Sequence, residues 1–100
     1  MKKKVVSKKL ASRVSHPFLI GKNYLIRTVT HYYLGKLVAV FDHELLLNDA
    51  SWVASTGRYF SALRDGVLDE VEPCNGPAII GRGAIVDAVE WKSTLILVQK

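Results

Sequence analysis

The sequence predicts a mainly β protein: a small, strongly bent antiparallel β-barrel with one short helix and an extended basic N-terminal arm. Three observations predict this class. Short runs of β-branched and aromatic residues recur from residue 22 onward, and residues 24–30 and 84–91 alternate between two faces. The links between the runs are short, which favours antiparallel hairpins. Only one stretch spaces its apolar residues as a helix does, and 100 residues suffice for one domain.

The first half of the predicted barrel is a meander. Residues 24–30 alternate well and form the first strand, and residues 34–41 form the second. The polar residues 42–44 make a tight turn into a third strand at 44–47. Residues 51–54 are predicted to continue the meander as a fourth, short strand.

The single predicted helix covers residues 58–65. Residues 55–57 offer an N-terminal cap, and Gly66 suits a left-handed terminator. Three apolar residues fall on one face at helical spacing: Phe60, Leu63 and Val67. We expect this face to pack over the mouth of the barrel.

The remaining strands follow a turn at Gly76 and Pro77. Residues 78–80 form a short strand, and the glycines of residues 81–83 interrupt it. Residues 84–91 alternate clearly, and residues 95–98 are predicted as the last strand.

Charge divides the chain into two parts, an arm at residues 1–21 and a barrel domain at residues 22–100. The formal net charge is +5, from 14 basic and 9 acidic residues. Six of the basic residues lie in the first 13 positions, with no acidic residue among them: Lys2, Lys3, Lys4, Lys8, Lys9 and Arg13. The rest of the chain has a net charge of −1. A basic tail therefore adjoins a near-neutral body.

The arm has several candidate roles. It could contact nucleic acid, an anionic membrane surface or an acidic patch on a partner, or it could be a solvated terminus. An acidic segment lies elsewhere in the chain: Asp65, Asp69, Glu70 and Glu72. Either this segment is a solvated face, or it receives the arm of a neighbouring copy, which would lead to a homo-oligomer.

Enzyme chemistry has no positive support in the sequence, and we expect no catalytic residue, cofactor or metal. Asp42, His43 and Glu44 are consecutive, so their side chains would converge on one ion only if the turn curled them together. Cys74 is the only cysteine, which excludes an intramolecular disulfide. No apolar run approaches the roughly 20 residues of a membrane-spanning helix, so we expect no membrane partner.

A ligand-binding alternative rests on three residues of the strands and turns. Arg27 and Arg82 could supply cations, and Tyr33 could supply a stacking face, for nucleic acid or a small nucleotide. Tyrosine is also common in half-buried strands, and the body carries no excess positive charge.

The order of several short segments resembles a family of small, uncharacterised phage and prophage proteins that is classed as a domain of unknown function. The resemblance covers about residues 23–91 and is carried by Ile26-Arg27-Thr28, Gly35-Lys36-Leu37, Leu47-Asn48-Asp49-Ala50, Trp52, Gly57, the segment 63–67 and the segment 84–90. It implies a phage origin and supplies no active site. Gly35-x-Leu37 followed by Leu47-x-Asp49-Ala50 also resembles the first half of a small SH3-like or Sm-like barrel. The N-terminal helix and second motif of the Sm fold are not evident.

Together these observations favour a phage-encoded, non-enzymatic structural or assembly protein. It would be a virion accessory, associated with capsid or tail, or a small barrel that multimerises. Its partners would be other phage proteins or copies of itself, in the virion or the host cytoplasm. The alternative is an intracellular binding module for nucleic acid or for a nucleotide signal of host defence.

Overall fold

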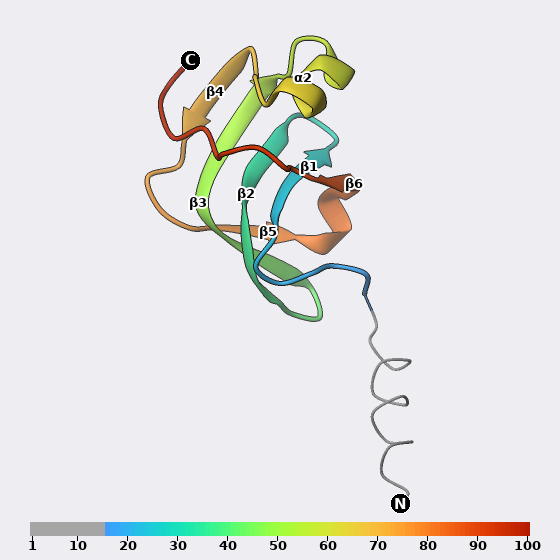
Figure 1. Cartoon of the computed structure of the whole chain (residues 1–100). Coiled ribbons are helices and arrows are strands. Elements are labelled where there is room, and N and C mark those ends of the chain that lie inside the picture. Colours follow the sequence, from blue (N-terminus) through green and yellow to red (C-terminus); the bar gives the residue numbers. More distant parts are fainter. Residues whose placement is uncertain (1–15) are drawn as a thin grey trace, which may run out of the picture.

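The computed structural model describes residues 16–100 (Figure 1). Its elements, in chain order, are β1 (Asn23–Thr28), β2 (Tyr32–Val40), β3 (Glu44–Ser55), α2 (Tyr59–Asp65), β4 (Glu70–Pro73), β5 (Ala78–Gly81), the 3-10 turn η1 (Arg82–Ala84) and β6 (Ile85–Glu90). The mainly β class with one short helix is confirmed. Among the described residues, no helix is long and apolar enough to cross a membrane.

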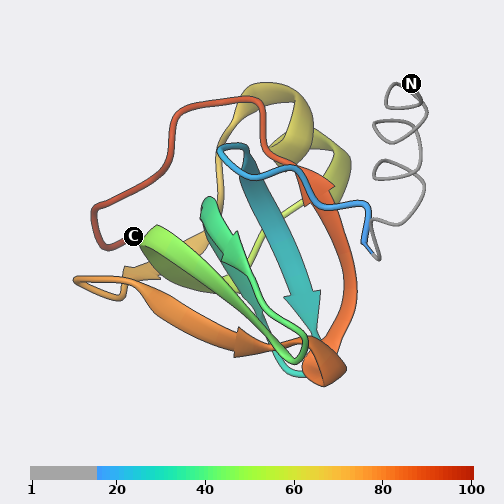
Figure 2. The same ribbon diagram turned by 90° about the horizontal axis from the view of Figure 1, so that it is seen from below.

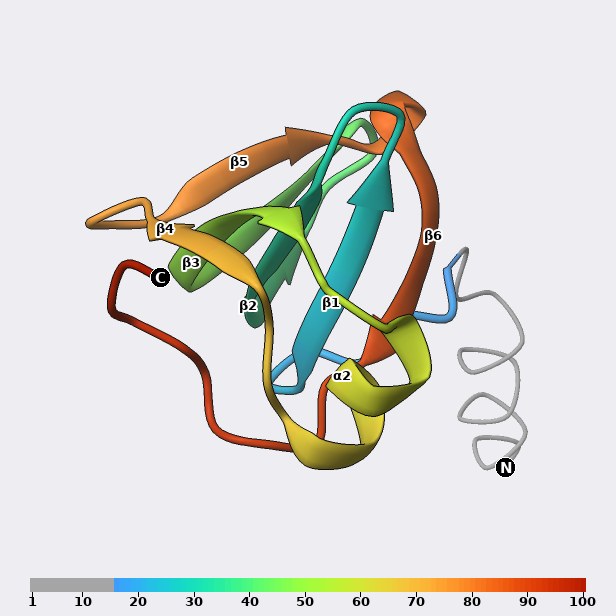
Figure 3. The same ribbon diagram turned by 90° about the horizontal axis from the view of Figure 1, so that it is seen from above.

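The six strands form one antiparallel sheet in the order β4-β3-β2-β1-β6, and β5 pairs with the first half of β3. Figure 2 shows the strong bend of this sheet from below. Figure 3 shows β5 and β6 meeting at η1, beside the turn between β1 and β2. No ladder joins β5 to β6 within residues 16–100, so the bent sheet stays open on this side rather than closing as a barrel.

The sheet carries a core cluster on each of its two faces, to which alternate residues of each strand point. On β1, Tyr24 and Ile26 join a core cluster with Leu45 and Ile80, inside the bend. Leu25 points to the other face and joins a second cluster with Trp91, which the helix covers through Ala62. Three consecutive residues of β1, 24–26, are therefore buried, because the strand contacts a core cluster on each side.

The helix α2 agrees with the predicted position, and Gly66 ends it in the left-handed conformation with φ 71°. The predicted N-terminal cap is wrong. Arg58 occupies the cap position and makes no side-chain capping hydrogen bond with the described residues. Ser55 Oγ instead donates to Asp69, and Thr56 Oγ1 donates to the Gly57 carbonyl.

The third and fourth predicted strands are one strand, β3, so the predicted break is wrong. The β2–β3 register shifts where Leu34 pairs with Ser51 and Lys36 pairs with Asn48. Asp49, with φ 49°, lies at this shift, so the segment between the two predicted strands is a bulge within one strand rather than a break. The bulge bends the strand, and β4 and β5 then pair with its two halves.

The predicted last strand at 95–98 is also wrong, because this segment is irregular. Leu95 and Ile96 instead pack against the second core cluster. Ser51 Oγ donates to the Ile96 carbonyl over 2.7 Å, and Val71 and Lys100 exchange backbone hydrogen bonds of 3.0 and 2.9 Å. Residues 91–100 thus form a C-terminal strap over the face of the sheet that includes β4. The sequence did not predict β4.

The residues just before β1 already contact the body. Phe18 packs against the first core cluster, and the Leu19 backbone N–H donates to Tyr24 Oη over 2.9 Å. The Gly21 N–H donates to the Leu37 carbonyl. Residues 16–21 therefore act as a clip that fixes the chain at the start of β1. The six basic residues predicted to form the arm's binding surface lie outside the described residues.

Candidate functional site

A groove lies at the open side of the sheet, where β5 has no strand partner besides β3 among residues 16–100. One wall consists of residues 28–31 of the β1–β2 turn together with Tyr33. The other consists of residues 79–81 of β5 together with Ala84. Its volume is about 250 Å³. We call it the seam groove, because it occupies the gap that a closed barrel would fill.

The walls of the seam groove carry large apolar side chains in contact with solvent. Val29 is 85% exposed and Ile79 is 74% exposed. Exposed apolar side chains that gather at a concave site are typical of surfaces that bind a partner.

An aromatic cluster extends the groove along β2 and β3. The His31 ring lies 4.7 Å from the Tyr33 ring and 5.0 Å from the Trp52 ring, measured between centroids. Tyr33 and Trp52 are cross-strand partners, so they lie on the same face. Trp52 remains 39% exposed, which leaves part of its face open to a bound group.

His31 brings an unsatisfied polar atom to this wall. Its Nδ1 is hydrogen bonded to Thr30 Oγ1 over 2.8 Å, and its carbonyl accepts from Thr28 Oγ1 over 2.7 Å. Its Nε2 is buried and makes no hydrogen bond with any described residue. Buried polar atoms usually have a partner, so an occupant of the groove with a polar group would satisfy His31.

Two acidic residues of β4 lie beside the aromatic cluster. Trp52 pairs with Glu72, and Ser55 pairs with Glu70. Val71 between them is buried on the opposite face, so Glu70 and Glu72 point to the same exposed side. We call these two residues the acidic rim.

The other members of the predicted acidic segment are engaged locally. Asp65 accepts hydrogen bonds from the neighbouring Arg64 at 2.9 and 3.0 Å, which lowers the pKa of its carboxyl group. Asp69 accepts from Ser55 Oγ over 3.2 Å. Only part of the acidic segment therefore faces the surface beside Trp52.

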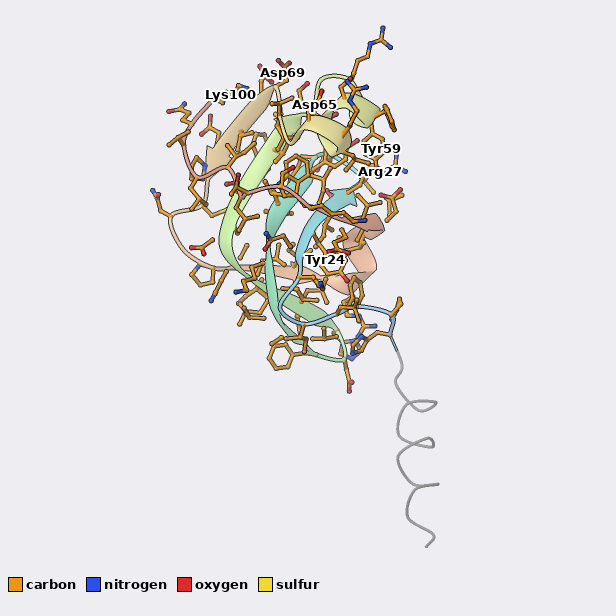
Figure 4. The ribbon with its side chains drawn as sticks, in the orientation of Figure 1. Tyr24, Arg27, Tyr59, Asp65, Asp69 and Lys100 are labelled. Carbon is orange, nitrogen blue, oxygen red and sulfur yellow. The ribbon has the colours of Figure 1, made fainter. Side chains whose placement is uncertain are left out.

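A second pocket, of about 310 Å³, lies where β1 and β6 approach the start of the helix. Its lining residues are Arg27, Tyr32, Tyr59 and Asp87. Figure 4 shows Tyr59 beside Arg27. Arg27 Nη2 and Asp87 Oδ2 are 2.5 Å apart, and Arg27 Nε donates to the same oxygen over 3.1 Å. We call this the Arg27 pocket.

Burial and neighbouring charges shift the pKa of Tyr59, one of the two tyrosines of this pocket. Burial raises the pKa of Tyr59 above its ordinary value, and the Asp87 carboxylate and Tyr32 raise it further. The hydrogen bond to Asp87 raises the pKa of Arg27, which stays fully protonated. The pocket therefore presents the Arg27–Asp87 ion pair beside two tyrosine rings.

The three residues of the ligand-binding prediction do not converge. Arg27 pairs with Tyr32, whereas Tyr33 pairs with Ile26 on the opposite face. Arg82 lies in η1, and its Nη1 donates to the carbonyls of Phe41 and Asp42 at 2.7 and 3.3 Å. Arg82 thus ties η1 to the β2–β3 turn, a segment about 40 residues earlier in the sequence.

Sequence reasoning missed Tyr32, Tyr59 and Asp87 as neighbours of Arg27. One signal was present: residues 24–30 and 84–91 both alternate, so a pairing that places opposite charges face to face would have selected Asp87 for Arg27. Tyr59 comes from the helix, whose docking position carries no signal of this kind.

Within residues 16–100, no three His, Cys, Asp or Glu side chains are grouped so that they could hold a metal ion. Cys74 is exposed, and partial burial raises the pKa of its thiol, which lowers its nucleophilic fraction at neutral pH.

No family model matches the chain, and a search of curated proteins likewise returned no match.

Proposed function

We propose that this protein is a non-enzymatic assembly protein that multimerises by binding the basic arm of one copy in the seam groove of the next. The phage origin implied by the sequence resemblance would make it a virion accessory or an assembly factor of the phage. The observation that carries the proposal is the open side of the sheet, with exposed Val29 and Ile79 on the two walls of one groove.

An open strand edge is a template for a further strand. Within the described part of the chain β5 pairs with β3 alone, and its other side faces the seam groove. An extended segment bound there would gain backbone hydrogen bonds from β5 and apolar contacts from the groove walls. Recognition of this kind needs no catalytic group.

The N-terminal segment has the composition that this surface favours. Residues 1–15 combine six basic side chains with the apolar Val5, Val6 and Leu10. Apolar side chains of the segment would contact Ile79 and the aromatic cluster, and its cations would lie near the acidic rim. Opposite charge adds to the rate and the specificity of such an encounter.

The proposal takes a second copy, rather than the same copy, as the donor of the arm. The clip at residues 16–21 fixes the chain beside Tyr24, at the start of β1. The seam groove lies beyond Thr28, at the other end of that strand. A six-residue strand spans about 20 Å, so the arm of the same copy would have to fold back along the domain.

The test is the molar mass of the full-length chain in solution, measured by sedimentation equilibrium over a range of concentrations. The proposal predicts oligomers for the native chain and a shift towards the monomer for Ile79→Glu, which places a charge on the groove wall. Replacing the six basic residues of the arm with glutamine in the full-length chain should give the same shift.

The matched control is Val98→Glu. Val98 is 69% exposed on the strap and lines neither the seam groove nor the Arg27 pocket. This variant should keep the native mass. A native chain that stays monomeric at high concentration, or equal losses in Ile79→Glu and Val98→Glu, would refute the proposal. Circular dichroism melts confirm that each variant is folded.

A further inference from the structure

We infer that the Arg27 pocket binds a single unpaired nucleobase, through paired hydrogen bonds to Arg27 and Asp87 and contact with Tyr32 and Tyr59. This site is separate from the seam groove and does not depend on assembly. It retains Arg27 from the sequence prediction and replaces Tyr33 with two other tyrosines.

The charges of the pocket select against simple ions. Arg27 would attract an anion, but Asp87 lies against the same guanidinium and repels it. A cation would be attracted by Asp87 but repelled by Arg27. A neutral ligand that offers hydrogen bonds is therefore preferred over phosphate, a carboxylate or an amine.

The ion pair leaves one hydrogen-bonding atom of each partner available. Arg27 Nε and Nη2 both contact Asp87 Oδ2, whereas Arg27 Nη1 and Asp87 Oδ1 make no hydrogen bond with the described residues. The side chains are 47% and 44% exposed, so ligands can reach them. Both partners thus keep hydrogen-bonding capacity for a ligand that combines an acceptor with an N–H donor, as the edge of a nucleobase does.

Aromatic rings supply the remaining contact. Tyr59 is 41% exposed and Tyr32 is half-buried, and both line the pocket. Base stacking on aromatic side chains is a common source of affinity for unpaired bases. The volume of about 310 Å³ is at the lower end of small-molecule sites, which suits one base.

The experiment is a titration of the isotope-labelled full-length protein with three probes: guanosine, adenosine and a short single-stranded RNA. Nuclear magnetic resonance follows the Arg27 side-chain Nε–H and the Tyr59 ring. We expect saturable shifts of both groups with at least one probe. Shifts with a nucleoside show that a base on a single ribose is sufficient, and shifts with the RNA alone identify a base within a strand.

Matched substitutions on the helix test the site. Tyr59→Leu should weaken binding about tenfold, because it removes a stacking ring. Phe60→Leu, a change of the same kind at a 70% exposed neighbour outside the pocket, should change affinity less than about twofold.

Three results would overturn the inference. The first is the absence of shifts at Arg27 and Tyr59 with every probe. The second is an equal loss of affinity in Tyr59→Leu and Phe60→Leu. The third is RNA binding that persists in Tyr59→Leu but disappears when the basic residues of the arm become glutamine. None of these results bears on the seam groove, so the assembly proposal is tested separately.

Discussion

Arg27 of β1 and Asp87 of β6 are direct cross-strand partners, and their side chains form an ion pair beside the start of the helix. Both side chains are nearly half exposed, so solvent screens the pair and its contribution to stability is small. Its main effect is to fix the positions of a cation and an anion in the Arg27 pocket. Both charges also act on the pKa of the neighbouring Tyr59.

Asp87→Asn should lower the pKa of Tyr59 towards its ordinary value. Burial is the larger cause of the raised pKa and remains, but the repulsion between the Asp87 carboxylate and a Tyr59 phenolate is lost. Carbon-13 chemical shifts of the Tyr59 ring across an alkaline titration measure the change. Arg27→Gln should have the opposite effect, since Arg27 favours the phenolate. Movement of both variants in the same direction would contradict this electrostatic description.

The same shift predicts how stability depends on pH. The pKa of folded Tyr59 is higher than that of the unfolded chain, so the folded state holds the phenolic proton more tightly. This contribution is complete below the ordinary tyrosine pKa of about 10 and declines as the pH rises through the folded value. Urea melts of the native chain and Tyr59→Phe at alkaline pH should therefore show a steeper loss of stability for the native chain.

Gly66→Ala should destabilise the fold by about 1–3 kcal/mol, because an L residue is strained in the left-handed region. Gly66 has φ 71°, and an added Cβ would overlap the Ser93 side chain of the strap. The matched control is Gly83→Ala, whose Cβ would meet no atom of residues 16–100 within 4 Å. Denaturant melts should place this control within about 0.5 kcal/mol of the native chain.

Ser51→Ala should loosen the C-terminal strap. Ser51 is buried and donates to the Ile96 carbonyl, which would lose its partner at a cost of about 1–3 kcal/mol. Hydrogen exchange should become faster at the Val71 and Lys100 amides, which join the strap to β4. Ser61→Ala on the helix, where no side-chain hydrogen bond to the described residues is lost, should leave both amides unchanged. Unchanged exchange in Ser51→Ala would show that this hydrogen bond does not hold the strap.

Assembly should weaken as salt is added, because part of the proposed attraction is between the basic arm and the acidic rim. The screening length falls from about 10 Å at 0.1 M salt to about 3 Å at 1 M. Sedimentation at several salt concentrations measures the effect. Glu70→Gln combined with Glu72→Gln should flatten the salt dependence while leaving the apolar groove intact. An unchanged slope in this double variant would exclude the acidic rim from the contact.

Local patterns predicted most of the sheet. β1, β2, β5 and β6 coincide closely with predicted strands, and Gly66 ends the helix as its sequence indicates. The bulge at Asp49 was not predictable, because polar residues in a bulge and in a loop give the same local signal. β4 has one buried residue, Val71, among charged neighbours, so its pairing depends on β3 rather than on its own pattern.

The sites were less predictable than the strands. Arg27 carries a sequence signal, but Tyr33 was placed beside it although the pairing of β1 with β2 aligns Arg27 with Tyr32. A change of one residue in register moves a side chain to the other face. The seam groove depends on the distance between a turn and a strand about 50 residues apart in the sequence, which local patterns do not encode.

The most direct test of the assembly proposal is a cross-link from the groove to the arm. A photoreactive side chain replaces Ile79 in the full-length protein, and equal amounts of light and heavy isotope-labelled chains are mixed before irradiation. We predict cross-linked peptides that join position 79 to residues 1–15, with mixed light and heavy pairs that identify two copies. Cross-links to residues 1–15 within single copies only, or none to that segment, would contradict the proposal.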